Sequence, residues 1–309
     1  MHPIPSHPPL RHRLVARLAA APAVAVVAFA LLPAAQAATV FALGNDGATL
    51  LRFDSATPGT NSTVGVISGA TVKLDGLDFR PADGLLYGYA SATSGIYRVN
   101  TTTGATTLLS TSTGPVTAAT MGIDFNPVPD RLRVATNDGD NRRINIADGV
   151  AILDGTLAYA VGDVNAGATP RIADVAYTNS DKLVATGTQL YYIDWVLNTL
   201  VTTANPNGGV MNTVGALGVD TDQNVGFDIV TDAGGLNTAF ASLNVGGVQG
   251  FYGINLNTGA ATLIGSTGNT GPLIGLAVAP IPEPGSLALV MAAGAALALQ
   301  ARRGRTPAA

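Results

Sequence analysis

The chain has 309 residues and a formal net charge of −4, with 16 Lys and Arg against 20 Asp and Glu. It contains no cysteine, and its only histidines are His2, His7 and His12. A chain without cysteine forms neither disulfides nor thiolate zinc sites, so its stability depends on its hydrophobic core.

Residues 1–37 have the pattern of a secretory signal peptide. Three arginines precede an apolar run over residues 18–32, and a small-residue site, Ala35-Gln36-Ala37, follows it. The apolar run is shorter than the roughly 20 residues of a membrane-spanning helix, which disfavours the alternative of an N-terminal anchor. We therefore predict cleavage between Ala37 and Ala38.

Cleavage at this point would remove all three histidines. Ser-His-Asp and Cys-His nucleophiles, and zinc sites built on His or Cys, would then lack their essential side chains. Residues 38–280 carry 19 Asp, no Glu and 10 Lys or Arg, which gives a net charge of −9. Proteins that bind nucleic acids usually carry an excess of basic residues, which this segment does not have. We therefore predict no nucleic acid as a partner.

The segment 38–280 has the pattern of many short antiparallel strands. Apolar runs of four to six residues alternate with turn sequences such as Asp-Gly and Thr-Gly, and helical periodicity is almost absent. A Gly-x-Asp sequence marks the first strand of a repeating unit. It occurs at residues 76–81, 122–127 and 218–220, with a related sequence at 275–280 and a degenerate copy at 174–177.

Three further strands follow the first one within a unit, for example at residues 85–89, 95–100 and 106–111. Four strands in a unit of about 45 residues are typical of a β-propeller blade. The first unit lacks a leading strand, and the last unit consists of a leading strand alone. We therefore predict that residues 275–280 pair with the N-terminal strands, beginning at 39–43, and close a ring of five blades. Six blades, a sandwich or a solenoid are the alternatives.

The same segment resembles a catalogued bacterial family, the domain of unknown function 4394. The resemblance covers nearly all of residues 39–280 and is most distinctive at residues 122–134, 154–159 and 217–220. It implies a propeller-like fold and an exported or surface location. It implies no activity, because the family has none assigned.

Three aspartates share one position in the Gly-x-Asp repeat: Asp78, Asp124 and Asp220. Because the first strands of propeller blades line the central channel, we expect these carboxylates to converge there. They could hold Ca²⁺ through oxygen ligands, or act as an acid and base pair on a glycan. The alternative is a structural role, in which each carboxylate binds backbone amides of its own blade. Apart from this Ca²⁺ option, no metal or cofactor is predicted.

Three other groups of residues could form sites. Residues 137–141 are rich in oxygen ligands, but they fit a tight hairpin turn better than an EF-hand. Four arginines lie on the strands beside this turn. Two of them, Arg131 and Arg133, could bind an acidic polysaccharide or phosphate; the alternative is that the arginines pair with Asp130 and Asp140. Trp195, beside two tyrosines, could stack on a sugar, although such residues more often pack in the core.

Residues 281–309 contain three features in a fixed order. Pro282-Glu283-Pro284 comes first, an apolar stretch over residues 287–301 follows, and an arginine cluster ends it. This order resembles the PEP-CTERM sorting tail, which implies processing by an exosortase-like enzyme and an association with exopolysaccharide. The arginines favour a cytoplasmic end, which leaves the β domain outside the inner membrane. An ordinary tail anchor is the alternative.

Together these features predict an exported protein that is held at the inner membrane and then reaches the cell surface or the extracellular space. Its expected partners are signal peptidase, an exosortase-like enzyme and exopolysaccharide. We predict a non-enzymatic binding or structural role, because imidazole and thiol groups would be absent. The alternative is a carbohydrate-active enzyme or lactonase-like hydrolase that uses the channel aspartates, an analogy that rests on the fold alone.

Overall fold

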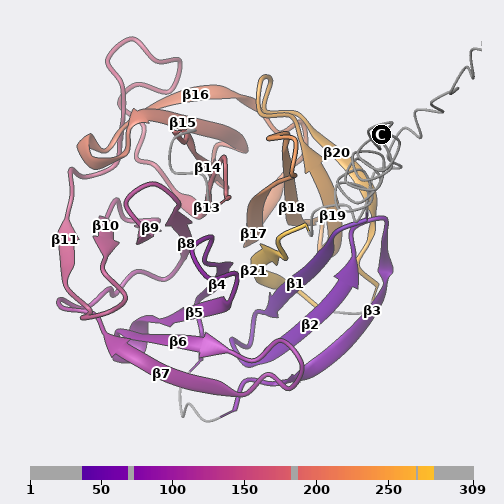
Figure 1. Ribbon diagram of the computed structural model, residues 1–309. Coiled ribbons are helices and arrows are strands. Elements are labelled where there is room, and N and C mark those ends of the chain that lie inside the picture. Colours follow the sequence, from indigo (N-terminus) through magenta and orange to yellow (C-terminus); the bar gives the residue numbers. More distant parts are fainter. Residues whose placement is uncertain (1–36, 69–72, 182–186, 269–270, 282–309) are drawn as a thin grey trace, which may run out of the picture. The chain divides into compact units, whose positions relative to one another are not determined.

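The computed structural model describes residues 37–68, 73–181, 187–268 and 271–281. In these ranges the chain is all-β, and its strands form five sheets (Figure 1). Apart from residues 37 and 281, the predicted signal peptide and sorting tail lie outside the described residues and stay predictions. Within the described ranges, no helix is long and apolar enough to cross a membrane.

Four of the sheets are blades of consecutive strands. The first contains β4 (Gly76–Phe79), β5 (Leu86–Ala90), β6 (Gly95–Val99) and β7 (Thr106–Thr111). The second contains β8 (Met121–Asn126), β9 (Arg131–Thr136), β10 (Asn141–Ile144) and β11 (Ala151–Leu153). The third contains β13 (Ile172–Tyr177), β14 (Leu190–Asp194), β15 (Thr199–Asn205) and β16 (Val210–Ala216), and β12 (Ala158–Tyr159) adds to β16 in parallel. The fourth contains β17 (Thr221–Thr231), β18 (Asn237–Val245), β19 (Val248–Ile254) and β20 (Ala261–Ser266).

The fifth blade joins strands from the two ends of the propeller. It contains β1 (Thr39–Gly44), β2 (Thr49–Asp54) and β3 (Thr57–Val66), and its innermost strand is β21 (Leu273–Val278) (Figure 1). β21 pairs antiparallel with β1, so that Val40 lies opposite Val278 and Phe41 opposite Ala277. The predicted five-bladed ring and its closure by the two ends are therefore confirmed. This pairing covers the edge of β1 that would otherwise be open.

Tight turns with positive φ connect neighbouring strands within the blades. Gly47 (φ 66°) and Gly139 (φ 91°) adopt the left-handed region in the turns that precede β2 and β10. In the second of these turns, residues 137–141, the Gly139 N–H donates to the Thr136 carbonyl oxygen at 3.2 Å. The oxygen-rich sequence therefore forms a hairpin turn, in which glycine is favoured by the backbone conformation.

Aromatic side chains pack between neighbouring blades. Phe41 of the fifth blade meets Phe79 of the first edge to face, with ring centroids 5.7 Å apart. Tyr87 and Phe125 join the first and second blades in the same way at 5.5 Å. Such pairs add about 0.5–1.5 kcal/mol each beyond the burial of their surfaces. The core thus consists of layers between the sheets, which hold the blades together side by side.

Glycine allows the innermost strands to approach one another. A Cβ on Gly122 would lie 2.4 Å from the Asp174 Cα, and a Cβ on Gly226 would lie 2.7 Å from the Gly275 carbonyl carbon. Distances this short exclude a side chain unless the neighbouring strand moves. Each of these glycines lies two residues before an aspartate of the innermost strand. Glycine is required at both positions because the neighbouring strand leaves no room for a side chain.

The first strand of the fourth blade lies further along the chain than the repeat predicted. Residues 218–220 belong to the loop before β17, and the equivalent Gly-x-Asp sequence is Gly226-Phe227-Asp228 within that strand. Apolar residues flank Asp228 on both sides, whereas residues 221–224, which follow the predicted copy, are polar. The prediction for 218–220 was wrong because a short Gly-x-Asp match that is not followed by apolar residues does not mark a buried strand.

Candidate functional site

Four carboxylates lie on the innermost strands of four successive blades. They belong to Asp78 on β4, Asp124 on β8, Asp174 on β13 and Asp228 on β17. All four residues are buried, with 1% to 5% of their surface exposed. One oxygen from each of Asp78, Asp124 and Asp228 lies within 4.8 Å of the other two. Side chains from separate blades therefore converge near the centre of the ring.

Each of these carboxylates accepts an N–H from the innermost strand of the next blade. The bonds run from the donors to the acceptors as follows: Phe125 to Asp78 (2.7 Å), Tyr177 to Asp124 (3.2 Å), Phe227 to Asp174 (2.7 Å) and Val278 to Asp228 (2.5 Å). We call this set of four bonds the inter-blade clasp. The structural role considered for Asp78 and Asp124 is thus present, but the bound amide belongs to the neighbouring blade.

The remaining oxygens of two members also have backbone partners. Asp174 Oδ1 accepts the N–H of Val175 at 2.9 Å, and Asp228 Oδ1 accepts that of Ile229 at 2.6 Å. A carboxylate with one amide on each oxygen is held in a single orientation. These side chains are therefore fixed by the backbone on both sides.

Burial raises the pKa of the carboxyl groups in this cluster. For Asp78, burial and the nearby charges of Asp228 and Asp174 hold the pKa well above its usual value of 3.8. Burial likewise raises the pKa of Asp228 to about 7, although the backbone N–H donors act in the opposite direction. Since close carboxylates repel one another when ionised, we expect the cluster to hold protons at neutral pH.

Three close carboxylate oxygens could also share a cation. Ca²⁺ prefers six to eight oxygen ligands at roughly 2.3–2.6 Å, and such an ion would keep the carboxylates ionised. Hydrolysis of a glycan by an acid and base pair has a further requirement, because both carboxyl groups must reach the substrate. Here the side chains are buried and bound by amides. The geometry thus favours a structural clasp over a catalytic pair.

Asp220, the third residue predicted for this cluster, lies elsewhere. It is exposed in the loop between β16 and β17, and its Oδ1 accepts an N–H from Asn198 Nδ2 at 2.8 Å. The position is occupied by Asp228, which the repeat did not predict. The cluster also includes Asp174, which lies in the degenerate copy of the repeat but was not predicted as a member. Both residues are followed by an apolar residue, as Asp78 and Asp124 are, and this signal is present in the sequence.

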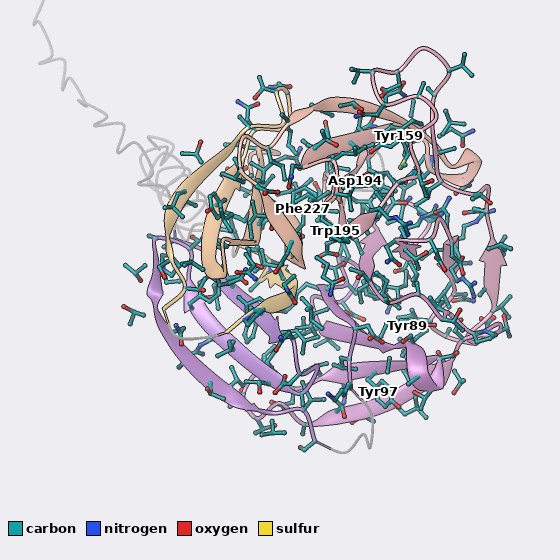
Figure 2. The ribbon with its side chains drawn as sticks, turned by 180° about the vertical axis from the view of Figure 1, so that it is seen from behind. Tyr89, Tyr97, Tyr159, Asp194, Trp195 and Phe227 are labelled. Carbon is teal, nitrogen blue, oxygen red and sulfur yellow. The ribbon has the colours of Figure 1, made fainter. Side chains whose placement is uncertain are left out.

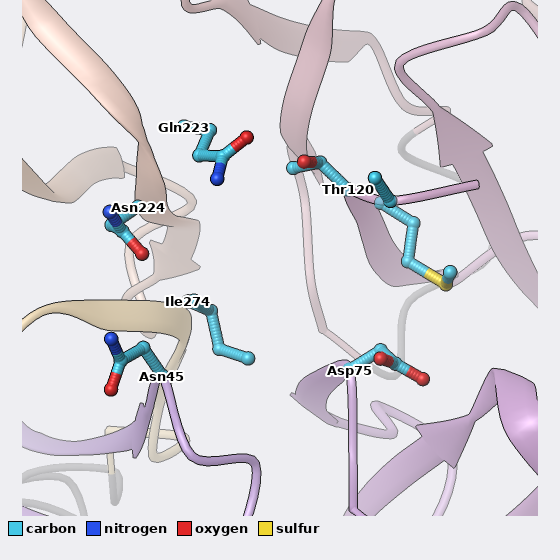
Figure 3. A pocket seen from close by; sticks show the side chains of 8 residues that line it. Asn45, Asp75, Thr120, Gln223, Asn224 and Ile274 are labelled. Atoms are coloured by element: carbon cyan, nitrogen blue, oxygen red, sulfur yellow. The ribbon is translucent and has the colours of Figure 1, made fainter.

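A polar cavity opens where the innermost strands begin (Figure 3). It has a volume of about 300 Å³ and is lined by Asn45, Asp75, Ala119, Thr120, Met121, Gln223, Asn224 and Ile274. We call it the axial cavity. Its lining residues come from four of the five blades, and the labelled side chains surround an open space in Figure 3. Amide and hydroxyl groups of this kind can both donate to and accept from a ligand.

The aromatic group near Trp195 belongs to the core. Trp195 is partly buried against the hydrophobic cluster shared by the third and fourth blades. The neighbouring Asp194 is fully buried and accepts the Tyr159 hydroxyl proton at 2.8 Å (Figure 2). These contacts agree with a packing role and do not favour a sugar-stacking platform.

The arginines beside the 137–141 turn have different partners. Arg142 forms an ion pair with Asp140. The Asp130 carboxylate is bound by Arg80, whose Nε donates to it at 2.8 Å. The pairing considered as the alternative is thus present for Arg142, whereas Asp130 is paired with Arg80 and not with Arg131. Arg131 lines a separate pocket with two other arginines.

The predicted processing sites lie at the limits of the described residues. Ala37 is exposed, whereas Ala38 is buried and its N–H donates to Ser55 Oγ at 2.9 Å. The predicted cleavage point thus coincides with a change from an exposed residue to one held by the propeller. The sorting motif Pro282-Glu283-Pro284 lies outside the described residues.

Comparison with known proteins gives a family and distant likenesses. Residues 49–277 match the family described as "Domain of unknown function (DUF4394)". A search of curated proteins gave no match. The chain is similar to one in the crystal structure of a nidogen/laminin complex, with a TM-score of 0.46 and 13% identity over 80% of this chain and 100% of that one.

Two further solved structures have comparable similarity. A protein of unknown function from Bacteroides thetaiotaomicron has a TM-score of 0.45 and 15% identity over 72% of this chain and 55% of its own. Hydrazine synthase from Kuenenia stuttgartiensis has a TM-score of 0.39 and 13% identity over 64% of this chain and 53% of its own. Likenesses of this size identify neither a ligand nor an activity for the present chain.

Replacing Asp174 by asparagine should destabilise the propeller. Asparagine has one acceptor oxygen, so it can keep only one of the two backbone N–H bonds that Asp174 accepts. Leaving a buried donor without a partner costs about 1–3 kcal/mol, which urea unfolding would detect. The matched control is Asp220→Asn, because its exposed side chain can still accept from Asn198. It should change stability by less than about 0.5 kcal/mol. Equal losses in both variants would argue against the clasp.

The stability of the protein should fall as the pH rises from 5 to 8. A carboxyl group whose pKa is raised to about 7, as for Asp228, binds more protons in the folded than in the unfolded chain between that value and 3.8. Folding is therefore favoured at the acid end of this window. The chain's histidines are confined to positions 2, 7 and 12, so few other side chains titrate there.

Thermal unfolding at both pH values measures this effect. One pKa unit corresponds to about 1.4 kcal/mol, so we expect a melting temperature lower by roughly 5 °C or more at pH 8. Adding Ca²⁺ or EDTA should leave the slope unchanged. If Ca²⁺ instead raised the melting temperature and reversed the slope, the cluster would be a cation site with ionised carboxylates.

Proposed function

We propose, for a chain that belongs to the DUF4394 family of unknown function, that it is an exported, non-enzymatic propeller that binds an extracellular glycan at its axial cavity. The observation that carries this proposal is the separation of two kinds of polar group. Mostly neutral side chains line an open cavity, with Asp75 as one carboxylate among them, whereas the carboxylates further along the same innermost strands are buried and bound by backbone amides.

The lining of the axial cavity suits a sugar. Asn45 and Gln223 are exposed and present amide groups, and Met121 and Ile274 add apolar surface. A sugar ring combines hydroxyl groups with apolar C–H faces, so a cavity with both kinds of surface can hold it. Pockets that bind small molecules commonly combine apolar walls with a few placed polar groups.

The carboxylates near the cavity favour binding over hydrolysis. Asp75 is the one carboxylate among the cavity's described lining residues, and its Oδ2 accepts the N–H of Ser91 at 2.6 Å. Glycosidases usually use two carboxyl groups on opposite sides of the scissile bond. A single, partly engaged carboxylate supports the non-enzymatic role over the hydrolase alternative.

The two ends of the propeller are compatible with removal of the terminal segments. The strands begin at Thr39 and end at Val278, and these two ends pair within one blade. Cleavage after Ala37 and processing near Pro282-Glu283-Pro284 would therefore leave every described strand intact. This supports a protein that loses a signal peptide, is held by its tail and is then processed by an exosortase-like enzyme.

Fractionation of cells that produce the full chain tests the export part of the proposal. We expect tail-processed protein outside the cells when an exosortase is present, and membrane-held protein when the exosortase gene is deleted. Replacement of Glu283 by alanine should act like the deletion if the Pro-Glu-Pro motif is recognised. Accumulation of unprocessed full-length chain in the cytosol would refute this part.

Cosedimentation with exopolysaccharide from the producing strain tests the binding part. The double substitution Asn45→Ala/Gln223→Ala removes two amide groups and should weaken binding roughly tenfold, since each neutral hydrogen bond contributes about 0.5–1.5 kcal/mol. Asn257→Ala, which removes an exposed amide in the turn between β19 and β20, is the matched control and should bind normally. Release of shorter glycans by the native protein would favour the hydrolase alternative.

A further inference from the structure

A second cavity lies between the second and third blades. It has a volume of about 410 Å³, and its lining includes Arg131, Arg133, Arg143, Asn126, Thr188 and Asn207. We call it the arginine pocket. The innermost strand β8 begins at Met121, which lines the axial cavity, and ends at Asn126, which lines this pocket. The two cavities are therefore at opposite ends of one strand.

The three arginines of this pocket are brought together by strand pairing. Arg133 on β9 lies directly opposite Arg143 on β10. Arg131 lies two residues before Arg133 and so shares its face of the sheet. Like charges directly opposite each other in a sheet destabilise it unless something compensates them. The pocket thus concentrates positive charge that needs a partner.

One carboxylate compensates only part of this charge. Asp154 Oδ2 lies 2.7 Å from Arg133 Nη1, and Asp154 Oδ1 lies 3.3 Å from Arg143 Nε. In the described part of the chain, Asp154 is the one carboxylate paired with these arginines. Three guanidinium groups and one carboxylate leave two positive charges.

Arg133 is committed to the fold. Its side chain is 2% exposed, and its guanidinium donates to Tyr177, Asn141, Asp154 and Asn207 at 2.7–3.2 Å. These bonds join the second blade to the third. Arg133 therefore positions the pocket, and its neighbours are better placed to bind a ligand.

Arg131 and Arg143 keep donors for a ligand. The Arg131 Nη1 donates to the backbone carbonyl oxygens of Pro129 and Asp130 at 3.1 and 3.0 Å, which fixes the guanidinium by one nitrogen. The Arg143 side chain is 34% exposed, and its buried Nε has no hydrogen-bond partner among the described residues. Arg131 is thus held through Nη1, and Arg143 through the ion pair of its Nε with Asp154. The remaining N–H groups of both guanidinium groups can bind an anion.

We propose that the arginine pocket binds the carboxylate group of an acidic sugar, so that the propeller recognises a polysaccharide containing uronic acid. The guanidinium fork matches a carboxylate through two parallel N–H···O bonds. The amide and hydroxyl groups of Asn126, Thr188 and Asn207 can bind the sugar hydroxyls. The pocket's volume lies within the roughly 300–1,000 Å³ of small-molecule sites. The inference rests on the proposed function, because it names the class of glycan bound.

Calorimetric titration of the full chain with trigalacturonate tests this inference. Native protein should bind it, and Arg131→Gln/Arg143→Gln should bind at least roughly tenfold more weakly, because a hydrogen bond to a charged group contributes about 1.5–3 kcal/mol. Arg98→Gln, which removes an equal charge from an exposed position on β6, is the matched control and should bind like the native protein. Unfolding curves should show that the variants remain folded.

Two comparisons separate the ligand classes. A neutral trisaccharide of galactose should not bind the pocket, and inorganic sulfate should compete only at much higher concentration than trigalacturonate. Equal affinity of the native and double-arginine proteins for trigalacturonate would overturn the site. Equal competition by sulfate would overturn the assignment to an acidic sugar. Because the axial cavity lies elsewhere, exopolysaccharide binding that depends on Asn45 and Gln223 would survive either failure.

Discussion

The bond between an inner-strand carboxylate and the amide of the next blade is the interaction on which this propeller depends. Neighbouring blades also meet through apolar side chains, which hold surfaces together but do not fix how far one strand slides along another. A short bond such as that from Phe227 N–H to Asp174, at 2.7 Å, sets this register. Four such bonds in succession give the ring a defined centre, and the polar loops at its two ends inherit their positions from it.

The clasp has four members and not five, which limits the repulsion between buried carboxylates. The innermost strand of the closing blade carries Ala277 where the other four carry aspartate. A fifth buried carboxylate would add repulsion to a cluster whose pKa values are already raised by burial. At this junction the backbones are in ordinary van der Waals contact, since a Cβ on Gly275 would lie 3.4 Å from the Gly76 Cα.

The repeat made most of the fold predictable, and its limits explain what was missed. The repeat left a single leading strand at residues 275–280 and an N-terminal blade that lacked its leading strand. Pairing the two was therefore the prediction that completed the ring. Asp78 and Asp124 were found because a Gly-x-Asp sequence in an apolar setting repeats. Asp228 was missed because the nearer sequence ending at Asp220 matched three letters, although the polar residues after it do not suit a buried strand. The sequence suggested Arg131 and Arg133 as an anion-binding pair, but the charge balance of the pocket could not be derived, because it depends on Asp154, which contacts the arginines only in three dimensions.

The charge of the propeller would give the proposed acidic-sugar site its selectivity. Residues 38–280 carry a net charge of −9, so most of the surface repels an acidic polysaccharide. That repulsion is screened beyond about 8–10 Å at physiological ionic strength, whereas the guanidinium groups of Arg131 and Arg143 act at contact distance. An acidic glycan would therefore be rejected over most of the surface and held at one place. A ligand with separate neutral and acidic sugars could meet both cavities, but only if its chain follows the outside of the ring, because the buried clasp closes the direct path along the axis.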